Sequence, residues 1–242
     1  SFRRIFTINR PEVNNAYNGD VINGLLDGLK FLETKNNVRV IVLRGNGRHF
    51  QAGADLKWIN EVSGRSKEDN ILVSKKTTDA IRFLDCCSIP TIALVHGGCF
   101  GGGTGIIAAC DIVIASKDAF FSISEVRWGL HAGPILPQLA AAIGTRNLRR
   151  YALTGERFGA EDAENLGLVH EVCPEGGLDV AASPVIESVL QNGPEAISDT
   201  KRIILEVMDL EIDDELAAVT VPSVSNTGFK EGIFSTEPFF GC

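Results

Sequence analysis

The sequence predicts an α/β protein, and two observations support this fold class. Apolar runs rich in Val, Ile and Phe alternate along the chain with stretches in which apolar residues recur at three- and four-residue steps. Several strand-like runs contain an uninterrupted apolar stretch, as is typical of a parallel sheet that is buried on both faces. The length of 242 residues fits one large domain, or one domain with a small appendage.

The strand-like runs are the clearest elements, because Gly, Pro, Asn or Asp bounds most of them. We expect strands at residues 4–8, 39–45, 91–97, 110–116, 119–123 and 168–173. Helical periodicity indicates helices at 21–33, at 69–87 before Pro90, and at 160–169 with an end near Gly167. Residues 60–72 are polar and contain Gly and Ser, which favours a mobile surface loop.

The character of the chain changes after about residue 180. Residues 181–208 and 211–220 are typical of helices, and no further strand follows them. We therefore expect a core that spans 1–180 and a C-terminal helical region that spans 181–242.

Composition excludes several classes of function. The net charge of −8 argues against general nucleic-acid binding, so an anionic ligand must be held by local cations or backbone N–H groups. The first residues are too polar for a signal peptide, and no apolar run is long enough for a membrane span. The six cysteines match no zinc pattern, and reduced thiols in a cytoplasmic protein are the interpretation we favour.

Two glycine-rich segments each follow a predicted strand. GGCFGGGTG covers 97–105 and precedes an apolar, helix-capable stretch, while AGAD covers 52–55. Each segment fits a tight turn, and Asp55 fits a helix cap, but each also fits a backbone N–H cradle for an anion. Neither has the spacing of a dinucleotide fingerprint or of a P-loop. Two N–H donors at separate strand ends are what a thioester enolate requires.

Five motifs occur in one order: NRPEVNNAY, HFQAGADL, HGGCFGGGTGIIAACDIVIAS, FSISEVRWGL and LTGERFGAEDAENLGLVHEV. Together they resemble the enoyl-CoA hydratase/isomerase (crotonase) family from about residue 4 to residue 175. The resemblance implies a spiral of β-β-α units with C-terminal helices that build trimers, often paired into hexamers. It also implies acyl-CoA thioester substrates. Coenzyme A is then part of the substrate, so no separate cofactor and no metal are expected.

The resemblance also implies the parts of the site. The oxyanion hole would consist of the N–H groups of Ala54 and Gly102. The segment Ala52–Lys57, which includes Asp55 and Leu56, would run along the coenzyme A. Lys57 fits a phosphate contact, and it fits a solvated surface lysine equally well.

Family hydratases carry two glutamates beside the attacking water, one just after the GGG and one in the S/P-E motif. This chain has Gly105 at the first position and Glu125 at the second. We therefore expect Glu125 to be the single acid/base group, and Gly105 to open space for an ordered water or for a branched substrate. His131 and Arg127 are the candidate partners of a substrate carboxylate, although His131 also fits a packed loop histidine.

The leading hypothesis is hydration of a 2-enoyl-CoA. The GGG-x-G and SEV pattern resembles bacterial hydratases of 3-branched glutaconyl-CoA thioesters, of the methylglutaconyl or isohexenylglutaconyl type. A Δ3,Δ2-enoyl-CoA isomerase is the alternative enzyme, because one glutamate suffices to move one proton. A non-catalytic acyl-CoA-binding protein is the alternative from another class.

Overall fold

A five-stranded parallel sheet forms the centre of the computed structural model, which describes residues 2–207. Its order is β1 (Arg3–Ile8), β2 (Val40–Gly45), β3 (Thr91–Val95), β5 (Ile112–Ser116) and β8 (Glu171–Cys173). A smaller sheet has the order β4 (Gly98–Phe100), β6 (Phe120–Ser122) and β7 (Phe158–Gly159), with β4 and β6 parallel and β7 antiparallel. The six expected strands are thus present, and the short β4 and β7 are additional.

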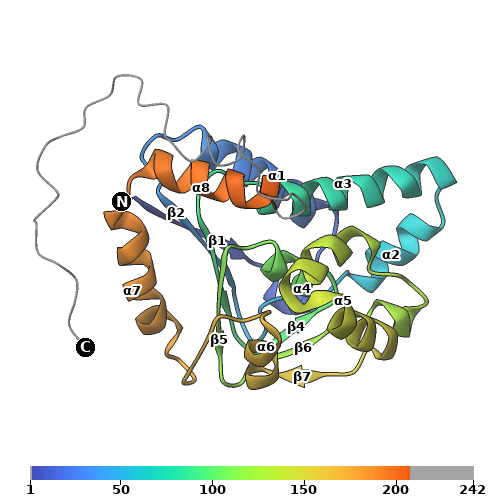
Figure 1. Cartoon of the computed structure of the whole chain (residues 1–242). Coiled ribbons are helices and arrows are strands. Elements are labelled where there is room, and N and C mark those ends of the chain that lie inside the picture. The colour runs from blue at the N-terminus through green and yellow to red at the C-terminus, as the bar shows by residue number, and fades with distance from the viewer. Residues whose placement is uncertain (1, 208–242) are drawn as a thin grey trace, which may run out of the picture. The chain divides into compact units, whose positions relative to one another are not determined.

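The central strands alternate between two apolar cores, which explains their continuous apolar sequence. Val40 and Val42 of β2 face a core that includes α7 (Leu178–Gln191). Ile41 and Leu43 of the same strand face the larger core on the other side. Figure 1 shows α7 on one side of this sheet and α4 (Gly102–Ala108), α5 (Leu136–Thr154) and α6 (Ala160–Leu166) on the other.

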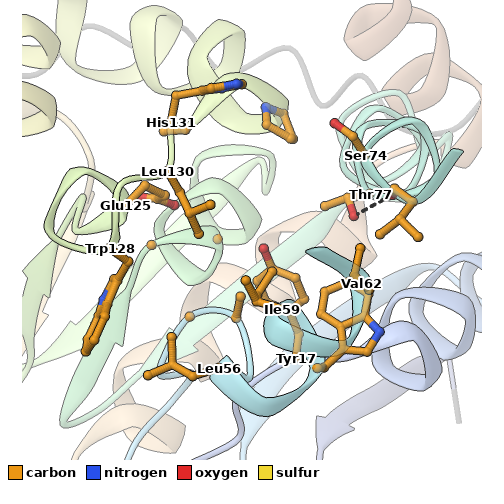
Figure 2. Close-up of a pocket in the computed structure, with 18 of the residues that line it drawn as sticks. Tyr17, Leu56, Ile59, Val62, Ser74, Thr77, Glu125, Trp128, Leu130 and His131 are labelled. Atoms are coloured by element: carbon orange, nitrogen blue, oxygen red, sulfur yellow. Dashed lines mark hydrogen bonds between the residues drawn. The ribbon is translucent and has the colours of Figure 1, made fainter. Parts of the chain in front are cut away.

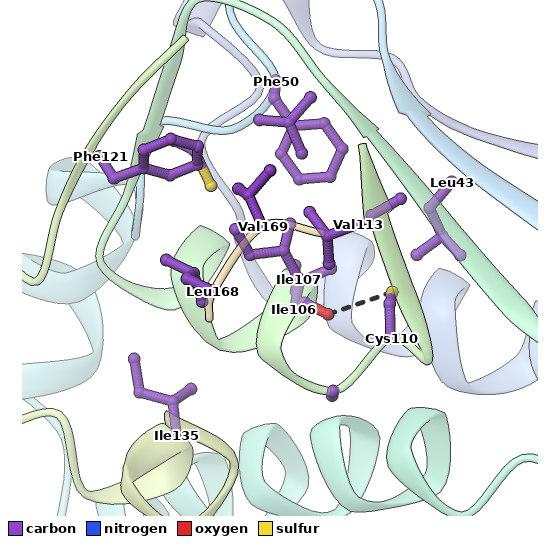
Figure 3. Close-up of a cluster of buried hydrophobic side chains, with 14 of the residues drawn as sticks. Leu43, Phe50, Ile106, Ile107, Cys110, Val113, Phe121, Ile135, Leu168 and Val169 are labelled. Atoms are coloured by element: carbon purple, nitrogen blue, oxygen red, sulfur yellow. Dashed lines mark hydrogen bonds between the residues drawn. The ribbon is translucent and has the colours of Figure 1, made fainter. Parts of the chain in front are cut away.

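The larger core lies between the two sheets and the helices of that side. Figure 3 shows the side chains of α4, among them Ile106 and Ile107, beside Phe50, Phe121 and Val113. Ile107, Phe50 and Phe121 are completely buried. The glycine-rich segment before α4 therefore enters the core directly, which fixes its position.

Side chains cap the N-termini of several helices. Asn18 accepts a hydrogen bond from the Val21 N–H at the start of α1 (Gly19–Glu33), and Ser66 accepts one from the Asp69 N–H at the start of α3 (Lys67–Asp85). The expected loop at 60–72 is wrong: α2 (Leu56–Ser63) and α3 cover most of it, with only residues 64–66 between them. Its polar residues are the solvent-facing sides of these helices.

The C-terminal helices differ from the expected single segment at 181–208. Residues 192–193 are not helical, so α7 ends before them and a separate helix, α8 (Pro194–Val207), follows. The residues through Leu205 form one compact unit, because α7 packs on the central sheet. Lys201 of α8 also reaches Asp111, with 2.9 Å between Nζ and Oδ2. The helix expected at 211–220 lies outside the described residues.

Within residues 2–207, no helix has the length and apolar character that crossing a membrane requires.

Candidate active site

Two glycine-rich loops lie side by side where β2 and β3 end. The Gln51 N–H donates to the Gly98 carbonyl at 3.2 Å, and the Phe100 N–H donates to the Gln51 carbonyl at 2.9 Å. Gly53 and Gly101 have φ angles of +85° and +49°, which other residues rarely adopt. A Cβ at Gly103 would overlap Gln51 Oε1 and stand 3.0 Å from the Gln51 carbonyl oxygen, whereas one at Gly53 would make only an ordinary contact with the Phe100 carbonyl. The glycines therefore allow two backbone turns to approach each other closely.

Each loop leaves one backbone N–H without a partner. Tyr17 donates to the Gly53 carbonyl at 2.9 Å and accepts from the Asp55 N–H at 2.8 Å, so the intervening Ala54 N–H points away from Tyr17. Gly102 is the first residue of α4, where N–H groups have no partner within the helix. Among the hydrogen bonds that join residues 2–207, neither the Ala54 N–H nor the Gly102 N–H takes part. Both residues line the same cavity.

Gln51 fixes the first loop, and the sequence analysis gave it no role. Its side chain is completely buried, donates to the Gly53 carbonyl at 2.9 Å and accepts from the Gly53 N–H at 2.8 Å. It also fills the space that a side chain at Gly103 would occupy. A polar residue between the apolar Phe50 and the AGAD segment is the signal that would have identified it.

Asn15 performs a similar role for the preceding motif. It is completely buried and donates to the carbonyls of Asn46 and His49 at 2.7 and 2.8 Å. Its neighbour Asn14 accepts from the Ala52 N–H at 3.1 Å. NRPEVNNAY therefore supports the segment that carries Ala54.

Glu125 brings a carboxylate to these loops. It begins a short 3-10 helix, Glu125–Trp128, which follows soon after the end of β6. Its Oε1 lies 3.0 Å from the point where a Cβ of Gly101 would stand, so a side chain at Gly101 would crowd the carboxylate. Its Oε2 is buried and has no hydrogen-bond partner among residues 2–207. Burial raises the pKa of this carboxyl above its usual value.

The cavity has a volume of about 570 Å³ and is mainly apolar. Figure 2 shows its walls: Ile59 and Val62 from α2, Ser74 and Thr77 from α3, and Glu125, Trp128, Leu130 and His131 on the opposite side. The segment 60–80, which we expected to be a loop in part, thus forms a helical wall of the site. An apolar enclosure strengthens electrostatic interactions with any charge that develops inside it.

Most of the predicted site residues meet at this cavity. It is lined by Ala52, Ala54, Leu56, Gly102, Glu125 and His131. Asp55, Lys57 and Gly105 are not part of its lining. Asp55 caps α2 by accepting from the Lys57 N–H, and it forms an ion pair with Arg10 at 3.1 Å. The Lys57 side chain is exposed.

The expectation that Gly105 opens space is wrong. A Cβ at Gly105 would overlap Cγ2 and Cβ of Ile135 and would lie 3.4 Å from its Cδ1. Ile135 is buried and lines the cavity. Its apolar side chain thus occupies the place beside Gly105, so neither a water nor a substrate branch has room there.

Arg127 is also excluded as a partner of a bound carboxylate. Its Nε donates to the Gly155 carbonyl at 2.9 Å, and the residue does not line the cavity. His131 remains available: its Nδ1 accepts from the Gly133 N–H at 3.3 Å, and the residue is exposed at the cavity.

Comparison with known proteins identifies the family of this chain. The model of the enoyl-CoA hydratase/isomerase family matches residues 4–223. A peroxisomal Δ(3,5)-Δ(2,4)-dienoyl-CoA isomerase of Arabidopsis thaliana is 35% identical over 220 residues, which are 86% of this chain and 79% of that protein. A hydroxycinnamoyl-CoA hydratase-lyase of Pseudomonas fluorescens is 34% identical over 193 residues, 77% of this chain and 69% of that protein.

A solved structure gives the same result for the fold. The crystal structure of an enoyl-CoA hydratase from Shewanella pealeana superimposes with a TM-score of 0.87 at 33% identity, covering 91% of this chain and 82% of that one. Isomerases and hydratases thus resemble this chain to similar degrees, so identity alone does not choose the reaction. The chain belongs to the enoyl-CoA hydratase/isomerase family and has its α/β crotonase fold.

Proposed function

We propose that this protein hydrates a 2-enoyl-CoA thioester with one carboxylate as both base and acid. The observation that supports this most is the buried Oε2 of Glu125. It lacks a protein partner and lies in the same apolar cavity as the free N–H groups of Ala54 and Gly102. A buried carboxylate oxygen requires a hydrogen-bond donor, and a water molecule can supply one.

The reaction needs three groups of this chain. Water bound to Glu125 attacks C3 of the substrate while Oε2 takes one of its protons. The electrons of the double bond move toward the thioester oxygen, and the N–H groups of Ala54 and Gly102 stabilise the resulting enolate. Glu125 then returns the proton to C2, so one water is added and the enzyme is unchanged. The raised pKa of Glu125 suits this exchange, because its two forms are closer in energy near neutral pH.

Coenzyme A is proposed to lie along Ala52–Lys57, next to the cavity. Ala52 and Leu56 line the cavity itself. Lys57 is exposed and its charge suits a phosphate of the coenzyme. Asp55 has a different role in this proposal, since its carboxylate is engaged by Arg10 and by the start of α2.

A 3-branched glutaconyl-CoA is the proposed substrate type, and the apolar wall of the cavity and His131 support it. The space expected at Gly105 is filled, so a branch would have to lie against the apolar wall of α2 and α3. His131 is the one basic side chain among the described residues that line the cavity, and it is the proposed partner of the terminal carboxylate.

Isomerisation is the second candidate, and one observation favours it. Glu125 is the sole carboxylate that lines the cavity within residues 2–207, and Ile135 closes the side where hydratases carry a second one. A Δ3,Δ2-isomerase needs only to remove a proton from C2 and return it at C4, which one carboxylate can do.

Mass spectrometry of the products separates these reactions. Purified protein is incubated with crotonyl-CoA, a 3-branched glutaconyl-CoA and a 3-enoyl-CoA in H₂¹⁸O. Hydration adds one labelled water, whereas isomerisation of the 3-enoyl-CoA leaves the mass unchanged and is detected by the ultraviolet absorbance of the conjugated 2-enoyl thioester that forms. Preference for the branched glutaconyl-CoA over crotonyl-CoA supports the proposed substrate type, and the reverse preference contradicts it.

Glu125→Gln is the matched variant. We expect it to abolish turnover while binding of the thioester changes little, because the amide keeps the size of the side chain. If no thioester is converted by either protein, the non-catalytic alternative holds. If the variant turns over as fast as the wild type, Glu125 has no part in the reaction.

The trimer or hexamer implied by family resemblance stays a prediction, which light scattering tests.

A further inference from the structure

Tyr17 contacts both loops that carry the free N–H groups. Its backbone N–H and carbonyl pair with Gly53 and Asp55 on either side of Ala54, at 2.9 and 2.8 Å. Its ring lies directly on Gly102: a Cβ there would overlap Cε1 of Tyr17 and stand 3.1 Å from Cζ and 3.2 Å from Oη. One residue therefore joins the two sides of the oxyanion hole.

The Tyr17 hydroxyl is free to bind a ligand. The residue lines the cavity, and Figure 2 shows its side chain reaching in from below, beside Ile59. No hydrogen bond among residues 2–207 uses Oη. The ring is held from behind by the edge of Trp58, with 5.9 Å between the ring centroids. Its position is thus set by packing, and its hydroxyl has no structural partner.

The hydroxyl also stays protonated. Burial and the negative charge of Glu125 both raise the pKa of Tyr17 far above its usual value. A neutral phenol in an apolar cavity is a strong hydrogen-bond donor toward an anion.

We infer that the Tyr17 hydroxyl is a third donor to the thioester oxygen, beside the N–H groups of Ala54 and Gly102. This inference rests on the proposed enolate chemistry and adds a catalytic side chain to it. A third donor is useful here because an apolar side chain, Ile135, lies beside Gly105, and Glu125 is the one carboxylate among the described residues that line the cavity. Stabilisation of the enolate then carries more of the catalysis.

The test uses acetoacetyl-CoA, a β-ketoacyl thioester whose enolate absorbs in the near ultraviolet. Donors aimed at the thioester oxygen favour the enolate on the protein, so its absorbance reports them without any turnover. We expect Tyr17→Phe to lower the enolate fraction roughly 10- to 100-fold, as for loss of a hydrogen bond to a charged group. Binding of butyryl-CoA should change little, because this saturated thioester forms no enolate at neutral pH.

Tyr151→Phe is the matched control, because Tyr151 is the only other tyrosine of the chain and lies buried in the core, away from the cavity. It should leave the enolate fraction unchanged. An unchanged fraction in Tyr17→Phe overturns the inference. So does an upward shift of the acidic limb of kcat/KM without a loss of enolate, since Tyr17 would then act on Glu125.

Two further outcomes keep the inference separate from the proposed function. If the wild type forms no enolate, the oxyanion hole itself is refuted. If the wild type forms it and Tyr17→Phe does too, only the role of Tyr17 fails. Should Tyr17→Phe not fold, 3-fluorotyrosine in the Tyr151→Phe chain labels Tyr17 alone. Its ¹⁹F resonance should then shift more with acetoacetyl-CoA than with butyryl-CoA, and equal shifts overturn the inference.

Discussion

Gly105→Ala tests the packing between α4 and Ile135. Gly105 lies inside α4, and an added Cβ would come closer than 3.0 Å to two carbons of Ile135. Apolar carbons in packed cores stay about 3.5–4.0 Å apart, so one side must move. Ile135 cannot rotate away, because the nearer atoms include its own Cβ.

The expected cost follows from two opposing effects. Replacing glycine by alanine inside a helix stabilises it by about 1 kcal/mol. Overpacking a well-filled core costs about 1–3 kcal/mol, and this contact with a non-rotatable atom belongs at the upper end. We therefore expect Gly105→Ala to lower the free energy of unfolding by about 2 kcal/mol, and Tm by roughly 4–8 °C for a chain of this size.

Urea and thermal unfolding measure this change, with Gly24→Ala as the control. Gly24 lies in α1 and a Cβ there meets nothing within 4 Å, so the same substitution should stabilise the protein by about 0.5–1 kcal/mol. Ile135→Ala alone should cost about 2–5 kcal/mol, and combined with Gly105→Ala the cost should be at least about 1 kcal/mol less than the sum. A Gly105→Ala protein as stable as the Gly24→Ala protein would refute the overlap.

Three further predictions concern Glu125 and Gln51. Because burial raises the pKa of Glu125, the acidic limb of the kcat/KM profile should lie above the ordinary value of 4.5, and a limb at or below 4.5 contradicts the assignment. The native protein also binds this proton more tightly than the unfolded chain, so the charged form destabilises the fold. Glu125→Gln should therefore raise Tm at pH 8, and the gain should vanish as the pH falls below 4.5. Gln51→Leu leaves the Gly53 N–H without a partner, while Tyr17 still donates to the Gly53 carbonyl, so it should cost about 1–3 kcal/mol in urea unfolding and also reduce turnover. Normal turnover in a folded Gln51→Leu protein would remove Gln51 from the support of Ala54.

The sequence alone predicted the fold class and most of the residues that line the cavity. The runs 39–45 and 91–97 indicate buried strands because both faces of the central sheet are covered, so residues 40–43 and 92–95 are apolar without interruption. The glycines of AGAD and GGG marked the two turns, because positive φ and close backbone approach are local requirements that only glycine meets well. Ordered motifs then predicted the family, which the comparisons confirmed.

Only the tertiary structure decided what fills the space around those groups. Ile135 covers Gly105 from thirty residues away, and Arg127 turns to Gly155 and not to the cavity. Likewise Tyr17, far from both glycine segments in sequence, lies on Gly102. Periodicity and turn residues report the local path of the backbone, whereas the neighbours of a side chain depend on which distant segments pack against it. A glycine in place of a larger residue therefore does not by itself predict open space, because a distant side chain can pack against it, as Ile135 does at Gly105.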